Sequence, residues 1–120
     1  MPIIHVSVTG KQDVQKKRDF MEFAANSICR HTSTLPKNIY VYFHEMEPEN
    51  VRKTAPTVLI DWTMIPDRTN EAKKAIMGEL TDELAKMTGE NRSEIVIIFN
   101  DIPLPNAMLG GITRADNYNW

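Results

Sequence analysis

The stretch Ile3-Ile-His-Val-Ser-Val8 decides the fold, because it sets a pattern that the chain later repeats. Its β-branched, partly alternating side chains predict a strand that Thr9-Gly10 ends. Leu35-Pro36 closes the helical pattern that follows, and Ile39-Tyr-Val-Tyr-Phe43 predicts a second strand. The apolar side chains of the intervening helix fall near one face, at Val14, Met21, Ala24 and Ile28.

The same order of elements recurs in the second half. Thr57-Val-Leu-Ile-Asp-Trp62 predicts a third strand and Ile95-Val-Ile-Ile-Phe99 a fourth. Between them, Thr69 or Asn70 can cap a helix, and Gly89 can end it. The apolar stripe of this helix is Ala72, Ile76, Leu80, Leu84 and Met87.

Residue matches favour a duplication over two merely similar units. Tyr42-Phe-His-Glu-Met46 corresponds to Ile98-Phe-Asn-Asp-Ile102 at an offset of 56, and Pro2 and Pro56 head the two strands. The predicted fold is therefore α+β: two tandem β-α-β units, about 2–55 and 56–120, in one domain spanning 1–120. They form a four-stranded sheet with both helices on one face, and the strands of each unit are parallel. The uncovered face carries apolar side chains, so association is expected.

Composition leaves a soluble globular protein as the default. The chain has 120 residues, 42% hydrophobic and 25% charged, with a formal net charge of −2. This balance gives no reason to expect nucleic acid or a membrane as partner. One cysteine, Cys29, excludes an intrachain disulfide, and the start lacks a signal-peptide pattern, so a cytoplasmic location is expected. No His, Asp or Glu spacing suggests a metal site.

Pro2 is the residue with the most distinctive chemistry. Removal of Met1 would expose a secondary amine, whereas the nitrogen of an internal proline is an amide without basicity. An ordinary α-amino group has a pKa near ~8, and burial or nearby cations lower it further. Such an amine can remove a proton beside a carbonyl at neutral pH. The alternative is that Pro2 merely begins a strand, where a missing N–H is harmless.

Five segments together resemble the tautomerase superfamily, whose prototype is 4-oxalocrotonate tautomerase. They cover nearly the whole chain as two fused copies: Pro2-Ile-Ile4, Gly10-Lys-Gln-Asp-Val-Gln-Lys16, Val41-Tyr-Phe-His-Glu-Met46, Asp67-Arg-Thr-Asn-Glu-Ala-Lys73 and Asn106-Ala-Met-Leu-Gly-Gly111. The resemblance implies the tautomerase fold, a homotrimer of fused chains, and a cofactor-free enzyme that moves a proton in enol or dienol carboxylates.

The resemblance also implies roles for particular residues. Pro2 would be the general base, and Arg68 would bind the substrate carboxylate, for which a planar guanidinium is well suited. Lys11 matches Arg68 in the first copy and would lie near Pro56, whose nitrogen is locked in a peptide bond. The chain should therefore hold one working site and one degenerate site.

Two departures from the prototype put its specific substrate in doubt. Tyr40 stands where the family has a second arginine, and Ala107 stands where it has an aromatic residue. Tyr40 or Tyr42 would be candidate substrate-binding residues that donate a hydrogen bond to a developing oxyanion. Their alternative role is packing against a neighbouring subunit.

Two other functions remain open. One is a hydratase or dehalogenase of the same superfamily acting on unsaturated acids, for which Asp101 is an available acid but a second arginine beside Arg68 is missing. The other is a non-catalytic β-α-β ligand-binding module, which would need no free proline amine.

Overall fold

The computed structural model describes residues 2–52, 58–64 and 69–116, and for 58–64 it describes the backbone only. The order of the main elements is β1 (Ile3–Thr9), α1 (Val14–His31), β2 (Tyr40–Met46), β3 (Val58–Met64), α2 (Asn70–Thr88), β4 (Ile95–Asp101), β5 (Met108–Leu109) and β6 (Ile112–Thr113). Short 3₁₀ turns precede β2 and β4, at Pro36–Asn38 and Arg92–Glu94, and follow them, at Pro48–Asn50 and Leu104–Asn106. The predicted α+β fold with two β-α-β units is confirmed.

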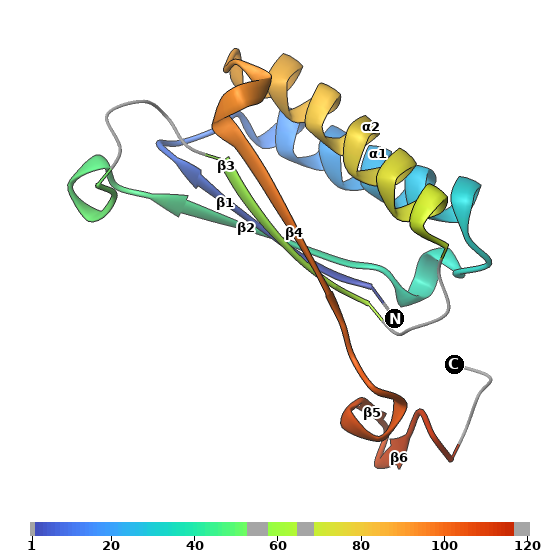
Figure 1. Cartoon of the computed structure of the whole chain (residues 1–120). Coiled ribbons are helices and arrows are strands. Elements are labelled where there is room, and N and C mark those ends of the chain that lie inside the picture. Colours follow the sequence, from blue (N-terminus) through green and yellow to red (C-terminus); the bar gives the residue numbers. More distant parts are fainter. Residues whose placement is uncertain (1, 53–57, 65–68, 117–120) are drawn as a thin grey trace.

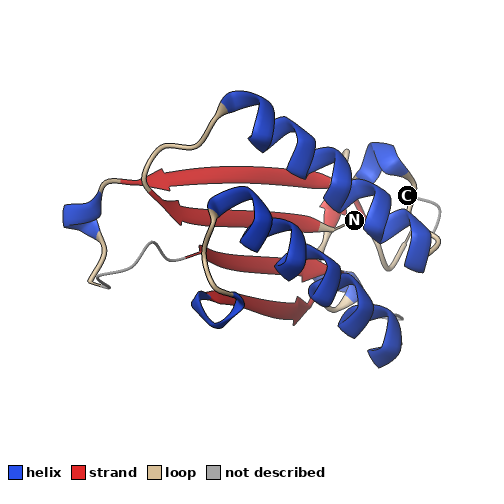
Figure 2. Cartoon of the chain, turned by 90° about the horizontal axis from the view of Figure 1, so that it is seen from above, coloured by secondary structure: helices blue, strands red, loops and turns tan. Residues whose placement is uncertain are grey.

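The four long strands form one sheet in the order β2-β1-β3-β4. Strand β1 pairs with β2 in parallel, and β3 pairs with β4 in parallel, as the crossover rule requires. The two units meet where β1 and β3 run antiparallel, with Ile3 opposite Thr63 and Val8 opposite Val58. Both helices lie over one face of this sheet (Figures 1 and 2).

The core lies between the sheet and the two helices. Alternate residues of β1 face the helices, and they are fully or almost fully buried: Ile4, Val6 and Val8. Each helix contributes three core side chains, which are Phe20, Ala24 and Ile28 from α1 and Ile76, Leu80 and Leu84 from α2. The predicted stripe of α2 is therefore correct in its centre.

The predicted stripe of α1 needs one correction. Phe20 is buried and packs edge-on against Phe43 of β2, with 5.6 Å between ring centroids. Val14, which the sequence pattern placed on the core face, is 56% exposed. Val14 is the first residue of α1, where no preceding helical turn covers its side chain.

Side-chain caps and a glycine set the helix ends. The Asp13 carboxylate accepts the Lys16 N–H at 3.1 Å, and the Thr69 hydroxyl accepts the Ala72 N–H at 3.1 Å. Thr69, and not Asn70, is the N-cap of α2. Gly89 ends α2 in the left-handed region at φ 75°, which glycine adopts without a Cβ penalty.

Equivalent features of the two units recur at a constant offset of 56 residues. This offset relates the N-caps, the core positions of the helices, the hydroxyls that bond back to the last turn of each helix, and the ion pairs between helix and strand. The pairs are Asp13 and Thr69, Phe20 and Ile76, Ala24 and Leu80, Ile28 and Leu84, Thr32 and Thr88, Lys17 and Lys73, and Glu45 and Asp101. The structure therefore contains a repeat in detail as well as in element order.

Among the described residues, both α-helices lie on the same face of the sheet, and the other face is left uncovered by them (Figures 1 and 2). Its exposed apolar side chains on β2 and β4 are Tyr42, Met46, Val96 and Ile98. Beyond β4 the chain leaves the sheet and forms the small hairpin β5–β6, which lies away from the helices (Figure 1). The hairpin exposes three large apolar side chains, those of Met108, Leu109 and Ile112. Within the described ranges, no helix is long and apolar enough to cross a membrane.

Candidate active site

Pro2 directly precedes β1, at the end of the sheet where β1 and β2 begin and β3 and β4 finish. This end of the sheet is called the Pro2 edge, and the other end the opposite edge. Pro2 is buried, and its carbonyl oxygen accepts the Tyr40 N–H at 3.0 Å. This bond continues the parallel ladder of β1 and β2 by one step, so the position of Pro2 is held by the sheet itself. A residue placed in this way is more rigidly held than one on a free terminus.

Several chain segments come together at this edge because of the antiparallel pairing of β1 with β3. Strand β3 ends opposite the beginning of β1, and β4 ends beside it, with Met64 paired to Asp101. Strand β3 therefore ends, at Met64, beside the start of β1 and Pro2. Arg68 belongs to the connection from β3 to α2 and lies outside the described residues; the next residue, Thr69, is the N-cap of α2.

Tyr40 and Tyr42 both lie on β2, on the face of the sheet that the helices do not cover. Tyr40 is nearer to Pro2, since its own N–H bonds to the Pro2 carbonyl. Tyr42 lies two residues further along β2 and pairs with His5 of β1. Their rings stack with 5.1 Å between the ring centroids. His5 Nδ1 and His44 Nε2 are 2.8 Å apart, so one N–H is shared between these two rings.

Lys11 lies at the opposite edge of the sheet from Pro2. It follows the end of β1, and a seven-residue strand is roughly 23 Å long. There it lines an open pocket of about 320 Å³ together with Gly10, Met46 and two glutamates. Within one chain the structure therefore brings Pro2 and Tyr40 together but keeps Lys11 apart from them.

The caps correct the match between Lys11 and Arg68. Arg68 directly precedes the N-cap Thr69, whereas Lys11 is two residues before the N-cap Asp13. The residue of the first unit equivalent to Arg68 is thus Gln12, because the cap bond fixes where each helix begins. The first unit has an uncharged amide where the second unit has a guanidinium.

The strand register similarly changes the residue matched to Pro2. Ile3 pairs with Tyr40, and at an offset of 56 Leu59 pairs with Val96. Val58 therefore occupies the register position of Pro2 in the second unit, and Pro56 precedes it by two residues. Pro56 itself lies outside the described residues. A valine inside the chain has an amide nitrogen, so this position has no amine.

A carboxylate holds the turn between β1 and α1. Glu45 accepts the Gln12 N–H at 2.6 Å and the Lys17 ammonium at 2.8 Å. The hydrogen bond from Lys17, followed by that from Gln12, lowers the pKa of Glu45 below its usual value.

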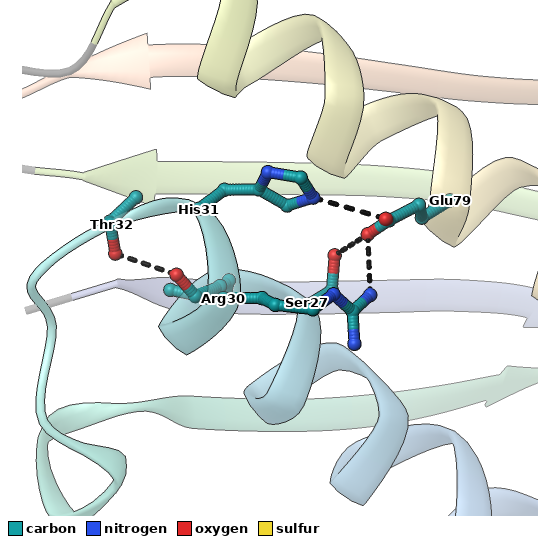
Figure 3. Close-up of polar contacts among 6 residues, drawn as sticks. Ser27, Arg30, His31, Thr32 and Glu79 are labelled. Carbon is teal, nitrogen blue, oxygen red and sulfur yellow. Dashed lines mark hydrogen bonds and ion pairs between the residues drawn. The ribbon is translucent and has the colours of Figure 1, made fainter.

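The sequence pattern did not reveal the most extensive polar cluster, which joins the two helices (Figure 3). Glu79 of α2 accepts a hydrogen bond from the buried Ser27, one from Arg30 at 2.9 Å, and one from His31 at 3.0 Å. The hydrogen bond from His31 and then that from Ser27 lower the pKa of Glu79 to about 2. The cluster bridges α1 and α2, so we assign it to stability.

We expect Glu79→Gln to lower the free energy of unfolding by about 1–2 kcal/mol at pH 7, since it removes the charge from three hydrogen bonds. The ordinary pKa of a glutamate is 4.5, so its contribution is complete above pH 4.5 and is lost as the pH falls toward 2. Urea unfolding of the wild type and of Glu79→Gln measures this loss, which should be smaller at pH 3 than at pH 7. Glu83→Gln, one turn further along α2, is the control. An equal loss of unfolding free energy in both variants at both pH values would contradict the stabilising role of Glu79.

No metal centre is evident in the part of the chain that the structure describes, where no three His, Cys, Asp or Glu side chains cluster to hold an ion. The Cys29 thiol donates a hydrogen bond to the Thr34 carbonyl at 3.3 Å. This contact closes the turn after α1 and gives Cys29 a structural role.

Comparison with known proteins agrees with this geometry. The family model described as tautomerase enzyme matches residues 2–52 and 56–116. The chain belongs to the tautomerase family. A search of curated proteins found no significant match. Two matched segments, and the similarity to fused proteins described next, make this chain a fused, two-copy tautomerase.

Three solved structures illustrate the similarity of the tautomerase fold. A native fused 4-OT is 17% identical, with a TM-score of 0.88 and coverage of 98% of this chain and 99% of that one. Pt0534 inactivated by 2-oxo-3-pentynoate is 22% identical, with a TM-score of 0.86 and coverage of 94% and 96%. The Q0 fused 4-OT, a symmetric trimer, is 15% identical, with a TM-score of 0.85 and coverage of 95% and 97%.

Proposed function

We propose that this tautomerase is a cofactor-free isomerase that moves a proton within enol or dienol carboxylates, with Pro2 as general base and Arg68 as the carboxylate ligand. The observation that carries the proposal is the position of Pro2: buried, and at the edge of the sheet where the connection bearing Arg68 begins. Family membership supports the reaction class.

The proposed reaction needs only a neutral amine and a fixed cation. After removal of Met1, the Pro2 nitrogen carries a lone pair, and burial favours its uncharged form. It takes a proton from one position of the conjugated substrate and returns it to another, so the amine is regenerated. A guanidinium on the substrate carboxylate holds the acceptor atom within reach of the amine and offsets charge that develops in the transition state.

The two tyrosines and Lys11 have different places in this proposal. Tyr40 is adjacent to Pro2 through its backbone, so its hydroxyl is the better candidate for a donor to the substrate oxygen. Tyr42 is one row away and 48% exposed, which suits a contact with a neighbouring subunit or a substrate bound between subunits. Lys11 lies at the opposite end of the sheet from Pro2. There the second unit has Val58 at the position equivalent to Pro2, and this residue has no free amine.

We also propose that the chain assembles as a homotrimer. The uncovered face of the sheet and the β5–β6 hairpin both expose large apolar side chains, which water solvates poorly. The Q0 fused 4-OT is a symmetric trimer with a similar chain fold. Light scattering of the purified protein should give three times the chain mass.

A direct assay tests the proposed activity. Phenylenolpyruvate and 2-hydroxymuconate are offered to the purified protein without any added cofactor, and ultraviolet absorbance follows the conversion of enol to ketone. We expect turnover of at least one of them by protein whose intact mass shows that Met1 is absent. Failure to tautomerise either compound, in protein lacking Met1, would contradict the proposed activity.

A further inference from the structure

Two histidine side chains meet on the uncovered face of the sheet, and the proposed reaction uses neither of them. His5 Nδ1 and His44 Nε2 are 2.8 Å apart, while the ring centroids are 5.1 Å apart and the ring planes differ by 14°. An imidazole ring is small, so these separations together require the two nitrogen atoms to lie almost on the line between the centroids. The rings therefore point end to end, in the geometry of a well-aligned N–H···N hydrogen bond.

This alignment limits how many protons the His5–His44 pair can hold. One ring donates its N–H to the lone pair of the other, so a single proton lies between the two facing nitrogens. A first extra proton can bind the outer nitrogen of the donating ring, and its charge then strengthens the bond. A second extra proton has only the accepting nitrogen left, where it would set two N–H groups and two positive charges against each other. The pair therefore binds its last proton only by opening.

Uncharged side chains flank the His5–His44 pair on β1 and β2. The Tyr42 ring stacks on His5, and Ser7 is the register partner of His44. Glu45 follows His44 in the chain, but its carboxylate is bound to a lysine of α1. Both helices lie over the other face of the sheet (Figure 2), so their charged side chains do not face the pair.

The remaining ionisable groups differ from the pair in place or in titration range. On the side of β3, the register partner of His5 is Asp61. Carboxylates ordinarily titrate at about pH 4, whereas histidine changes charge between about pH 5 and 8. The chain has three histidines, and the third, His31, is bonded to Glu79 between the helices. Between pH 7.5 and pH 5, a change of side-chain charge on the uncovered face therefore comes from the His5–His44 pair.

The His5–His44 pair also lies within the apolar surface of this face. His44 alternates along β2 with Tyr42 and Met46, which are 48% and 36% exposed, so the three side chains point to the same face. A second copy of the chain suits this surface, since each copy carries an apolar β5–β6 hairpin away from its own helices (Figure 1). Once a second copy covers the pair, two positive charges there would be shielded from water at a large cost in free energy.

We propose that the His5–His44 pair makes assembly of this protein depend on pH, so that subunits associate through the uncovered face at neutral pH and separate when acid opens the pair. This inference rests on the proposed homotrimer. His44 is exposed in the separated chain, so there the pair opens into water and binds its last proton. The separated chain then holds more protons than the assembled one, and acid favours separation. With one extra proton in each of three chains, the association constant falls by up to about 10³-fold per pH unit.

Light scattering of the full chain at a series of pH values between 7.5 and 5 tests the proposal. The wild type should have three times the chain mass at pH 7.5 and the mass of one chain at pH 5, and it should reassemble when the pH is raised again. His44→Gln should remain a trimer at pH 5, because its amide oxygen still accepts the N–H of His5 but binds no proton. Circular dichroism checks that the separated chains stay folded, and His5→Gln replaces His44→Gln should the latter not fold.

His31→Gln is the matched control, because it removes a histidine from the helix layer and leaves the pair intact. It should separate at pH 5 as the wild type does. A His44→Gln protein that separates over the same pH range as the wild type would overturn the proposal, since a response of the Pro2 amine or of a carboxylate would persist in that variant. Loss of the helical signal together with the trimer would also overturn it, because acid would then unfold the chain.

The same measurement separates this inference from the proposed assembly. A wild-type protein with the mass of three chains at every pH refutes the role of the His5–His44 pair and leaves the homotrimer in place. A wild-type protein with the mass of one chain at pH 7.5 refutes the homotrimer and, with it, the inference. Neither result bears on Pro2 as the base, which is tested by activity.

Discussion

Replacement of Pro2 with alanine is expected to lower kcat about 10²–10⁴-fold, the usual contribution of a positioned general base. The variant keeps an α-amine at the same position, but the nitrogen loses its ring and is no longer a secondary amine. The expected loss is in kcat, because Arg68 and the tyrosines would still bind the substrate. Initial rates at several substrate concentrations separate kcat from KM.

Two controls make the Pro2 experiment decisive. Alanine is also a small second residue, so intact mass should show removal of Met1 in both proteins. Pro48→Ala changes a proline at the start of the 3₁₀ turn that follows β2, at the opposite end of that strand from Tyr40 and Pro2, and should keep the wild-type rate. Equal rates for wild type and Pro2→Ala would show that the amine of Pro2 is not the base.

The second large effect is expected from Arg68. A hydrogen bond to a charged group is worth about 1.5–3 kcal/mol, so Arg68→Ala should lower kcat/KM about 10–100-fold, mostly through KM. Arg68→Lys should recover only part of this loss, because an ammonium does not form the bidentate contact of a guanidinium. Competitive inhibition by a saturated dicarboxylate gives an independent measure of carboxylate binding.

Arg18→Ala is the charge-matched control for Arg68→Ala. Arg18 is exposed on α1, so its removal changes the net charge equally without touching the Pro2 edge of the sheet. If Arg18→Ala weakened inhibitor binding as much as Arg68→Ala does, the loss would come from the change in net charge. Arg68 would then have no specific role.

The order and type of the main elements were predictable because local chemistry sets them. Runs of β-branched residues mark the strands, and Thr69 and Gly89 end α2 as expected. Strand ends were less predictable: β2 runs on to Met46, since its last residues pair with Ser7, Val8 and Thr9 of a strand distant in sequence. Likewise, Phe20 is recognisable as a core residue only once it is known that this side of α1 packs against β2.

Matches between the repeats were ambiguous in sequence, because similar residues recur at unequal offsets: Arg68 is 57 residues after Lys11, and Pro56 is 54 residues after Pro2. Hydrogen bonds resolve them: the cap of Asp13 makes Gln12 equivalent to Arg68, and strand register makes Val58 equivalent to Pro2. The shared edge of Pro2 and Asp101 depends on antiparallel pairing of the units, a long-range feature that no local pattern encodes. The Glu79 cluster is long-range in the same way.

The most direct test of the account is to identify the atom that an electrophilic substrate analogue modifies. The protein is incubated with 2-oxo-3-pentynoate, residual activity is followed, and the labelled peptide is sequenced by mass spectrometry. We predict one adduct per chain, on the nitrogen of an N-terminal Pro2, with activity lost in proportion to labelling. Inactivation accompanied by an adduct on Cys29 or a lysine, with Pro2 unmodified, would contradict the central role of Pro2.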